Sequence, residues 1–229
     1  MDVLVVGATR GSGLALTRRL VADGHRVTAF GRTASATFAV PADEQVEGPG
    51  SLRPLDGDAL DPEAVAKAVA GQDAVVVTLG ISDNPLAVQW LRRSSTPADV
   101  RSRGTATVVA AMRETGVRRL VVQSTYGLGD SWHYLDLTWK LVFRFVIGRQ
   151  FVDSGRQEDV VRASGLDWTL VRPVSLTDSP DGAAAEAPAH VTTDDTRRGL
   201  KVSRAQVAGV HAAALADPGT VGATLSVSA

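Results

Sequence analysis

The chain has 229 residues, of which 44% are hydrophobic, and it carries 24 basic and 25 acidic side chains. This length suits one domain with one substantial core, and the near-zero net charge gives no general attraction for nucleic acid or an anionic membrane. The sequence has no cysteine, which excludes disulfides, thiolate metal sites and cysteine nucleophiles. We therefore expect a single domain over residues 1–229 that binds a small molecule at a specific site.

Two features of the sequence predict a soluble cytoplasmic protein. The first apolar segment begins at residue 2 or 3, which leaves no room for a signal peptide. The longest apolar stretch, residues 141–152, is interrupted by Arg144 and Arg149, so we expect no membrane span.

Strand-like and helix-like segments alternate from one end of the chain to the other. This alternation predicts an α/β fold of Rossmann type, in which helices cover both faces of a doubly wound parallel sheet. The strand patterns lie at residues 2–6, 26–30, 51–55, 73–79, 118–123, 167–171 and 223–227, and helical patterns run from Ser12 to Ala22, from Asp61 to Gly71, from Thr96 to Gly116 and from Ser203 to just before Pro218.

Capping residues mark the ends of several of these helices. Asp61 stands directly before Pro62, an N-cap followed by a proline in the first turn. Ser203 and Gln206 have the spacing of a capping box. Gly71 closes the helix that Asp61 begins.

Three regions, residues 33–50, 80–95 and 174–202, do not fit the alternation. We expect the first only to connect its neighbours. The other two follow strands, so we expect them to overhang the carboxyl edge of the sheet as small substrate-side loops, where open α/β sheets bind their ligands. The amphipathic region 134–163 is expected to pack on the chain's own sheet or on a second copy, which leaves the oligomeric state open.

A glycine-rich turn follows the first strand. Gly7, Gly11 and Gly13 lack Cβ atoms, so a phosphate can approach the backbone closely and meet the free N–H groups of the helix that follows. Because this turn follows a strand and opens a helix, it predicts a bound dinucleotide rather than an ordinary tight turn.

Two arginines indicate which dinucleotide is bound. Arg32 lies at the end of the second strand, where a carboxylate would hold the ribose 2′-hydroxyl of NAD. An arginine there pairs with a 2′-phosphate instead, and Arg10 in the glycine turn adds a second positive charge. These residues predict NADP(H) as the cofactor; the alternative is that both arginines are solvated surface groups.

Two further strand ends carry candidate cofactor contacts. Asp58, after the third strand, could accept a hydrogen bond from the adenine amino group, or it could form an Asx turn that leads into the next helix. Leu79 and Gly80 end the fourth strand, where a small residue lets ribose and phosphates pass, although a glycine there can also be a simple turn.

Several segments together carry a resemblance to a known family. They are Val-Val-Gly-Ala-Thr at 5–9, Gly57-Asp58, Val-Ala-Gly-Gln-Asp-Ala-Val-Val-Val-Thr-Leu-Gly at 69–80, Ser-Gly-Leu-Asp-Trp-Thr-Leu-Val-Arg-Pro at 164–173 and Val-Ser-Arg-Ala at 202–205. The chain resembles the atypical short-chain dehydrogenase/reductases, and more narrowly the NAD(P)H-binding branch that includes biliverdin reductase B-type flavin reductases and NmrA-like redox sensors.

The resemblance implies a set of cofactor contacts. Pro173 and Val174 would pass beside the nicotinamide, although the proline can also simply end its strand. The other implied contacts are Gly7, Thr9, Arg10, Gly11, Ser12 and Gly13 for the pyrophosphate and ribose, Arg32 for the 2′-phosphate, Asp58 and Ala59 for the adenine, and Leu79 and Gly80 for the ribose of the nicotinamide half. The branch usually spaces its glycines as GxxGxxG, whereas this chain has GxxxGxG with Arg10, a turn that accompanies NADP in the dehydrogenases with a Tyr/Lys pair.

The sequence contains no tyrosine with a lysine four residues later, the pair with which many short-chain dehydrogenases protonate a carbonyl. By resemblance, Ser124 and Thr125 lie beside the nicotinamide and orient its carboxamide or the substrate; the alternative is that both hydroxyls satisfy local backbone. Tyr126 and His133 are candidate proton donors, or they form an aromatic pocket wall with the residues around His133.

These observations favour an NADPH-dependent oxidoreductase that reduces a small organic acceptor of the flavin, quinone, tetrapyrrole or carbonyl type. The alternative is a non-catalytic NADP-binding redox sensor of the NmrA-like type. Sugar-nucleotide epimerisation ranks last because it needs the missing Tyr/Lys pair. No histidine and carboxylate cluster has the spacing of metal ligands, so no metal is expected.

Overall fold

The computed structural model describes residues 1–39, 48–80, 96–128, 148–178 and 188–229. Within them, strands form one large sheet, parallel throughout except for its last strand, which runs antiparallel to its neighbour. The order is β3 (Ser51–Asp56), β2 (Arg26–Gly31), β1 (Asp2–Val6), β4 (Ala74–Val77), β5 (Arg119–Gln123), β6 (Asp167–Pro173), β10 (Ala223–Ser228) and β8 (His190–Thr192).

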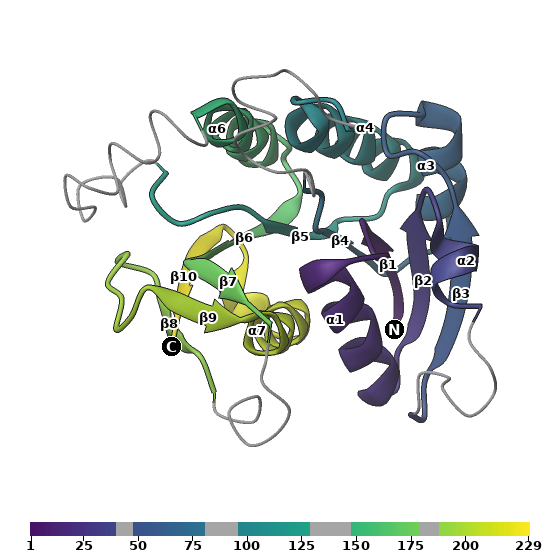
Figure 1. Cartoon of the computed structure of the whole chain (residues 1–229). Helices are drawn as coiled ribbons and strands as arrows, with labels where there is room; N and C mark the ends of the chain where they lie inside the picture. The colour runs from purple at the N-terminus through teal and green to yellow at the C-terminus, as the bar shows by residue number, and fades with distance from the viewer. Residues whose placement is uncertain (40–47, 81–95, 129–147, 179–187) are drawn as a thin grey trace.

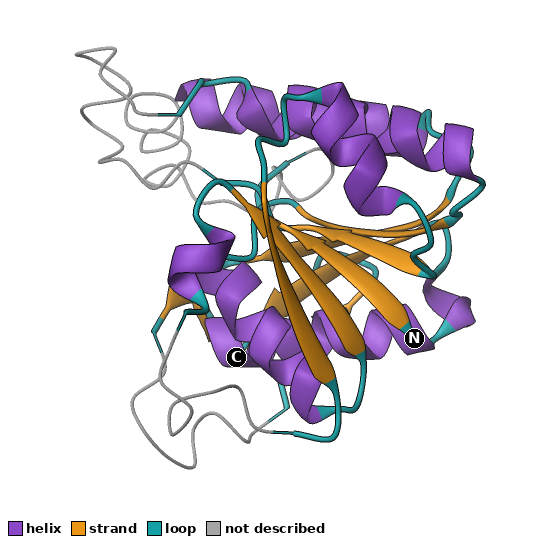
Figure 2. Cartoon of the chain, turned by 90° about the vertical axis from the view of Figure 1, so that its right-hand side faces the viewer, coloured by secondary structure: helices purple, strands orange, loops and turns teal. Residues whose placement is uncertain are grey.

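Helices cover both faces of this sheet (Figure 1). Figure 2 shows the twisted sheet between the two helical layers. One layer holds α1 (Gly11–Ala22) and α7 (Arg204–Ala216), and the other holds α3 (Pro62–Val69), α4 (Val100–Thr115) and α6 (Gly148–Arg162). The structure therefore confirms the predicted single-domain Rossmann-type α/β fold.

Strand β1 is buried on both faces. Val3 and Val5 belong to the core cluster under α1 and α7, whereas Leu4 and Val6 belong to the cluster under α3, α4 and α6. Because both faces are covered, the strand has a continuous apolar sequence instead of an alternating one. Its carboxyl end lies where the strand order reverses between β1 and β4.

All seven predicted strands are present, and their ends differ from the prediction by at most two residues. The expected N-caps are confirmed as well. The Asp61 carboxylate accepts hydrogen bonds from the N–H groups of Glu63 and Ala64, and Ser203 and Gln206 form the capping box. Local sequence therefore determines these helix starts.

Residues 33–50 were expected only to connect their neighbours and residues 174–202 to form a substrate-side loop, but both regions contain regular structure. The first region contains α2 (Ala34–Thr37), and the second contains β8 and a separate parallel pair, β7 (Ser175–Thr177) and β9 (Lys201–Ser203). Three-residue strands are too short to show an apolar periodicity.

The remaining element of the described residues is a 3₁₀ turn, Pro218–Thr220. Among the helices of the described ranges, none has the length and apolar character to cross a bilayer.

Candidate cofactor and active site

A cavity of about 520 Å³ lies at the carboxyl ends of β1 to β5. Its wall includes the glycine turn after β1, the last residues of β2 and β5, and the residues that follow β3 and β4. This is the position where open α/β sheets bind ligands, outside the strand ends at the point where the strand order reverses. The lining residues that were predicted as cofactor contacts are Gly7, Thr9, Arg10, Gly11, Ser12, Arg32, Asp58, Ala59, Leu79, Gly80 and Ser124.

The glycine turn brings the start of α1 against the end of β1. A Cβ atom on Gly13 would lie 2.2 Å from the Gly7 carbonyl oxygen and 2.6 Å from Thr78 Oγ1, so no side chain fits there. Gly7 has φ 88° and Gly11 has φ 54°, both in the left-handed region that favours glycine. Gly13 does not line the cavity itself; its part is to allow this close packing.

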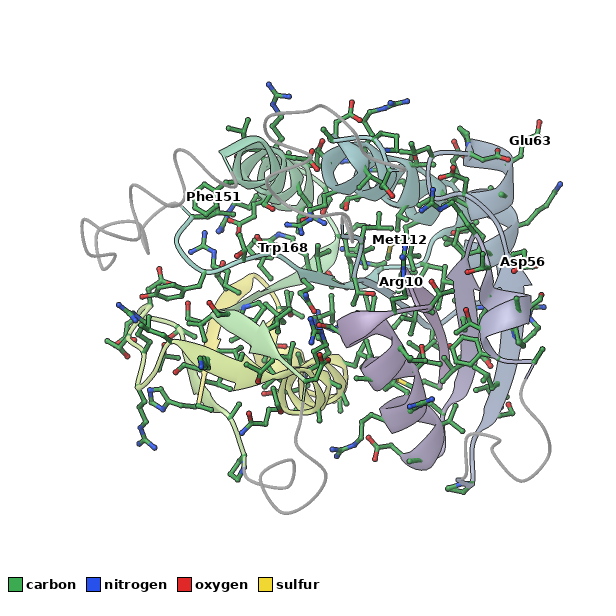
Figure 3. The ribbon with its side chains drawn as sticks, in the orientation of Figure 1. Arg10, Asp56, Glu63, Met112, Phe151 and Trp168 are labelled. Carbon is green, nitrogen blue, oxygen red and sulfur yellow. The ribbon has the colours of Figure 1, made fainter. Side chains whose placement is uncertain are left out.

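The turn is suited to hold a diphosphate. Arg10, labelled in Figure 3, is the N-cap residue of α1, and its side chain makes no capping hydrogen bond to the helix. Ser12 Oγ is buried and has no hydrogen-bond partner among the described residues. Free helix N–H groups and an unpartnered hydroxyl beside a cavity are the donors that a phosphate oxygen needs. These residues fit the phosphates of a dinucleotide.

Basic side chains surround the end of the cavity next to β2. Arg32 and Arg10 both line it, and Arg32 Nη2 lies 3.1 Å from Thr96 Oγ1. The nearby Asp56 carboxylate accepts a hydrogen bond from the Ser35 N–H at 2.9 Å, at the start of α2, and this bond lowers the pKa of Asp56. Asp56 does not line the cavity. Two arginines, and no carboxylate from the end of β3, therefore line this end of the cavity.

Asp58 forms the Asx turn that was the alternative to an adenine contact. Its Oδ1 accepts a hydrogen bond from the Leu60 N–H at 2.9 Å, although the residue also lines the cavity. Ala59 and Leu79 form an apolar wall under α4. A Cβ atom on Gly104 would lie 3.3 Å from Ala59 Cβ and 2.5 Å from Leu79 Cδ1, so the glycine lets α4 approach them. A flat adenine ring suits this wall.

Ser124 lies at the opposite end of the cavity and is held by a buried ion pair. Its Oγ donates to Glu158 Oε1 at 2.7 Å, and Glu158 also accepts hydrogen bonds from Arg172 at 2.9 and 2.7 Å. Burial opposes ionisation of Glu158, yet the bonds from Arg172 and Ser124 hold the pKa of this carboxyl below its usual value. The Ser124 hydroxyl thus donates its hydrogen bond to Glu158, and its oxygen can still accept a hydrogen bond from a group in the cavity.

Tyr126 and Thr125 do not line this cavity. The Tyr126 hydroxyl donates to the Asp195 carbonyl oxygen at 2.7 Å, and its ring borders a second cavity of about 400 Å³ with residues 195–200. The Thr125 hydroxyl donates to the Tyr126 carbonyl oxygen at 3.4 Å. The proposed proton donor Tyr126 is therefore placed away from the cofactor cavity, because the chain leaves the sheet after Ser124. His133 lies outside the described residues.

Pro173 and Val174 are also absent from the lining of the cavity. They continue the backbone pairing at the end of β6: the Pro173 carbonyl accepts from the Tyr126 N–H, and the Val174 N–H donates to Val227. Leu176 on β7 lines the cavity instead.

Two arginines of the cavity wall were missed by sequence reasoning. Arg204, the first residue of α7, lies over the glycine turn, since its Nε would be 3.4 Å from a Cβ atom on Gly11. It also forms an ion pair with Asp178. Arg101, in the first turn of α4, is the second. The Val-Ser-Arg-Ala segment contained Arg204 but suggested no contact for it.

Gln123, which lines the cavity, is linked to a buried histidine. His211 on α7 is fully buried, and its Nε2 lies 3.3 Å from Gln123 Oε1. Burial lowers the pKa of His211 to about 3, so the ring is neutral at physiological pH. A neutral ring with a proton on Nε2 fixes the orientation of the Gln123 amide.

We predict that His211 makes the fold sensitive to mild acid. The unfolded ring takes up a proton near pH 6.5, whereas the folded ring stays neutral down to about pH 3. Because the unfolded state binds more protons between these values, the free energy of unfolding falls as pH falls, by at most about 1.4 kcal/mol per pH unit. Urea titrations at pH 7, 6 and 5 measure this slope.

The variant His211→Gln should flatten that slope, and the control His25→Gln, which removes a partly exposed histidine, should not. The Glu158 carboxylate contributes in a lower window, below its usual pKa of 4.5, so the two groups are separable. An equal slope in His211→Gln and the unmodified protein would contradict the assignment.

Proteins of known structure share this fold. ChuY, an anaerobillin reductase from Escherichia coli O157:H7, aligns with a TM-score of 0.75 and 23% identity over 99% of this chain and 96% of its own. A short-chain dehydrogenase/reductase from Veillonella parvula, solved in complex with NADP, aligns with a TM-score of 0.74 and 18% identity over 100% and 94%. At these identities the likeness establishes the fold.

Two curated relatives match this chain over part of their own length. A 2-alkyl-3-oxoalkanoate reductase of Stenotrophomonas maltophilia is 39% identical over 125 residues, which are 55% of this chain and 33% of that protein. A 3-diazoavenalumate denitrifying reductase of a Streptomyces species is 38% identical over 130 residues, 54% of this chain and 38% of that protein. The chain thus covers little more than a third of either relative.

The family described as NAD(P)H-binding matches residues 7–218, nearly the whole chain. This match agrees with the glycine turn, the cavity at the strand ends and the fold, and it confirms the resemblance seen in the sequence. The chain belongs to the NAD(P)H-binding family, related to the atypical short-chain dehydrogenase/reductases.

Proposed function

We propose that this protein is an NADPH-dependent oxidoreductase that reduces a small organic acceptor of the flavin, quinone, tetrapyrrole or carbonyl type. The observation that carries the proposal is one cavity that joins a phosphate-binding glycine turn and two arginines at one end to Ser124 and Gln123 at the other. When bound, the cofactor supplies a hydride at its nicotinamide ring.

The residues of this chain bind and orient the two reactants. Arg10 and Arg32 would hold the 2′-phosphate at the end of the cavity next to β2. At the other end, Ser124 would accept a hydrogen bond from the carboxamide N–H of the nicotinamide. The buried Glu158 and Arg172 pair keeps the Ser124 hydroxyl in that orientation.

The described residues suit an acceptor that takes its proton from solvent. Along the described wall of the cavity the ionisable side chains are Arg10, Arg32, Asp58, Arg101 and Arg204, and none of these is poised to donate a proton at neutral pH. Flavins and extended tetrapyrroles can be protonated by water after hydride transfer. Three proteins similar to this chain are reductases, each with a different acceptor, which supports reduction as the chemistry.

A panel assay tests the proposal. NADPH oxidation, followed by its absorbance, should depend on an added flavin, quinone or small carbonyl compound, and NADH should be a poorer donor. Calorimetry should show binding of NADP in the absence of any acceptor. NADP binding without acceptor-dependent oxidation across the panel would contradict the reductase.

The second candidate is a non-catalytic redox sensor of the NmrA-like type. It is favoured by the hydroxyls of Ser124 and Tyr126, which are both committed to internal acceptors rather than free to donate a proton. A sensor must bind oxidised and reduced NADP with unequal affinity to shift any equilibrium. Titration with each form separates the two functions, because a reductase needs no such difference.

A further inference from the structure

We propose that Arg101 forms an anion subsite at the acceptor end of the cavity, and that the acceptor carries a carboxylate. This inference rests on the proposed reductase function, because it assigns the substrate class of the same cavity. Arg101 lies in the first turn of α4 and lines the cavity.

The position of the guanidinium places it at the nicotinamide end. Its Nη2 would lie 3.7 Å from a Cβ atom on Gly80, directly after β4, and its Nη1 donates to Ser154 Oγ at 2.6 Å. Ser154 stands one turn before Glu158 on α6, and Glu158 holds Ser124. Arg101 and Ser124 therefore border the same end of the cavity, over β4 and β5.

The hydrogen-bonding capacity of this guanidinium is largely unused. Of its five N–H donors, the structure describes one hydrogen bond, to Ser154, while Nε is buried without a partner. The nearby Asp153 carboxylate is already bonded to the N–H groups of Arg101 and Ser102 and to the Ser102 hydroxyl. A buried charged donor without a partner is costly, which favours a ligand that supplies the missing acceptor.

The charges of the cofactor have other partners in the cavity. Arg10 and Arg32 lie at the adenosine end for the 2′-phosphate, and Arg204 and the start of α1 lie at the glycine turn for the diphosphate. Arg101 is left without an anion of the cofactor. A carboxylate matches the two parallel N–H groups of a guanidinium. An acceptor with a carboxylate would complete the charge balance at this end.

Matched probes with and without a carboxylate test the subsite. In the presence of NADPH, 4-carboxybenzaldehyde is compared with its uncharged methyl ester, methyl 4-formylbenzoate. In the NADP complex, benzoate is compared with benzamide by calorimetry, which needs no turnover. The unmodified protein should prefer the anionic member, and Arg101→Met should lower that preference by about 10- to 100-fold.

Two further variants make the result specific. Arg101→Lys keeps the positive charge but lacks the two parallel N–H groups of a guanidinium, and it should retain part of the preference for the anionic probe. Arg103→Met removes an exposed arginine from the same helix and should change nothing. Circular dichroism and thermal unfolding verify that each variant is folded.

The inference and the proposed function fail in different ways. Equal binding of benzoate and benzamide to the NADP complex of the unmodified protein overturns the subsite, whatever the enzyme reduces. Loss of NADP affinity in Arg101→Met, without a change in anion preference, would show that Arg101 binds the cofactor, and this result would also overturn the proposed subsite. Absence of NADPH oxidation with every acceptor contradicts the reductase, while the benzoate measurement still decides the subsite.

Discussion

Replacement of Arg172 by methionine should lower the free energy of unfolding by about 3–5 kcal/mol, the cost of leaving one charge of a buried pair alone. The side chains of Arg172 and Glu158 are 4% and 6% exposed, and Arg172 also lies 3.4 Å from Asp195 Oδ2. The variant strands two carboxylates in the interior. Urea unfolding followed by tryptophan fluorescence measures the loss.

Two companion variants identify the cause. The double variant Arg172→Met with Glu158→Gln should be more stable than Arg172→Met alone, because it removes one of the two stranded charges. Arg118→Met is the exposed counterpart: Arg118 pairs with Asp167 at 2.9 Å, but the side chains are 60% and 41% exposed. Its loss should cost less than about 1 kcal/mol. Equal losses in Arg172→Met and Arg118→Met would contradict a special role for the buried pair.

Replacement of Arg32 by alanine should weaken NADPH binding by about 10- to 100-fold, since a charge-assisted hydrogen bond to a phosphate contributes roughly 1.5–3 kcal/mol. Adding Arg10→Ala should extend the loss to about 100- to 1000-fold. NADH affinity should be almost unchanged in both variants, because NADH has no 2′-phosphate. Fluorescence titration of each reduced cofactor gives the ratio.

The matched control for the cofactor variants is Arg53→Ala, an exposed arginine on β3 that does not line the cavity. It should leave the preference for NADPH over NADH intact. A parallel loss of NADH affinity in Arg32→Ala would show that the arginine supports the cavity generally and does not read the 2′-phosphate.

The first half of the fold was predictable because its signals are local. An unbroken apolar run predicts a strand covered on both faces, and Asp61 with Pro62 predicts a helix start, since each depends on neighbours in the sequence. The short strands β7, β8 and β9 were not predictable, because three residues carry no period and their pairing depends on distant partners.

The candidate site likewise contains residues that the sequence predicts and residues that it does not. The glycine turn and Arg32 could be found from motif spacing, whereas Arg101 and Arg204 reach the cavity from helix starts far along the chain. A capping motif predicts where α7 begins but not which cavity its first side chain meets. Likewise, residues 123–126 are all polar, so the sequence alone does not show which of them line the cavity after the chain bends at the end of β5.

The central place of β1 has a consequence for synthesis on the ribosome. This strand precedes both of its neighbours in the chain, β2 and β4, which end only at residues 31 and 77. Until β4 has emerged, one edge of a strand that is apolar from Val3 to Val6 is unpaired, the kind of edge that recruits other chains. The last strand of the sheet in chain order, β10, ends at residue 228, so β6 gains this neighbour only after residue 228 has been made. We expect the nascent chain to need protection from aggregation until β10 has been made.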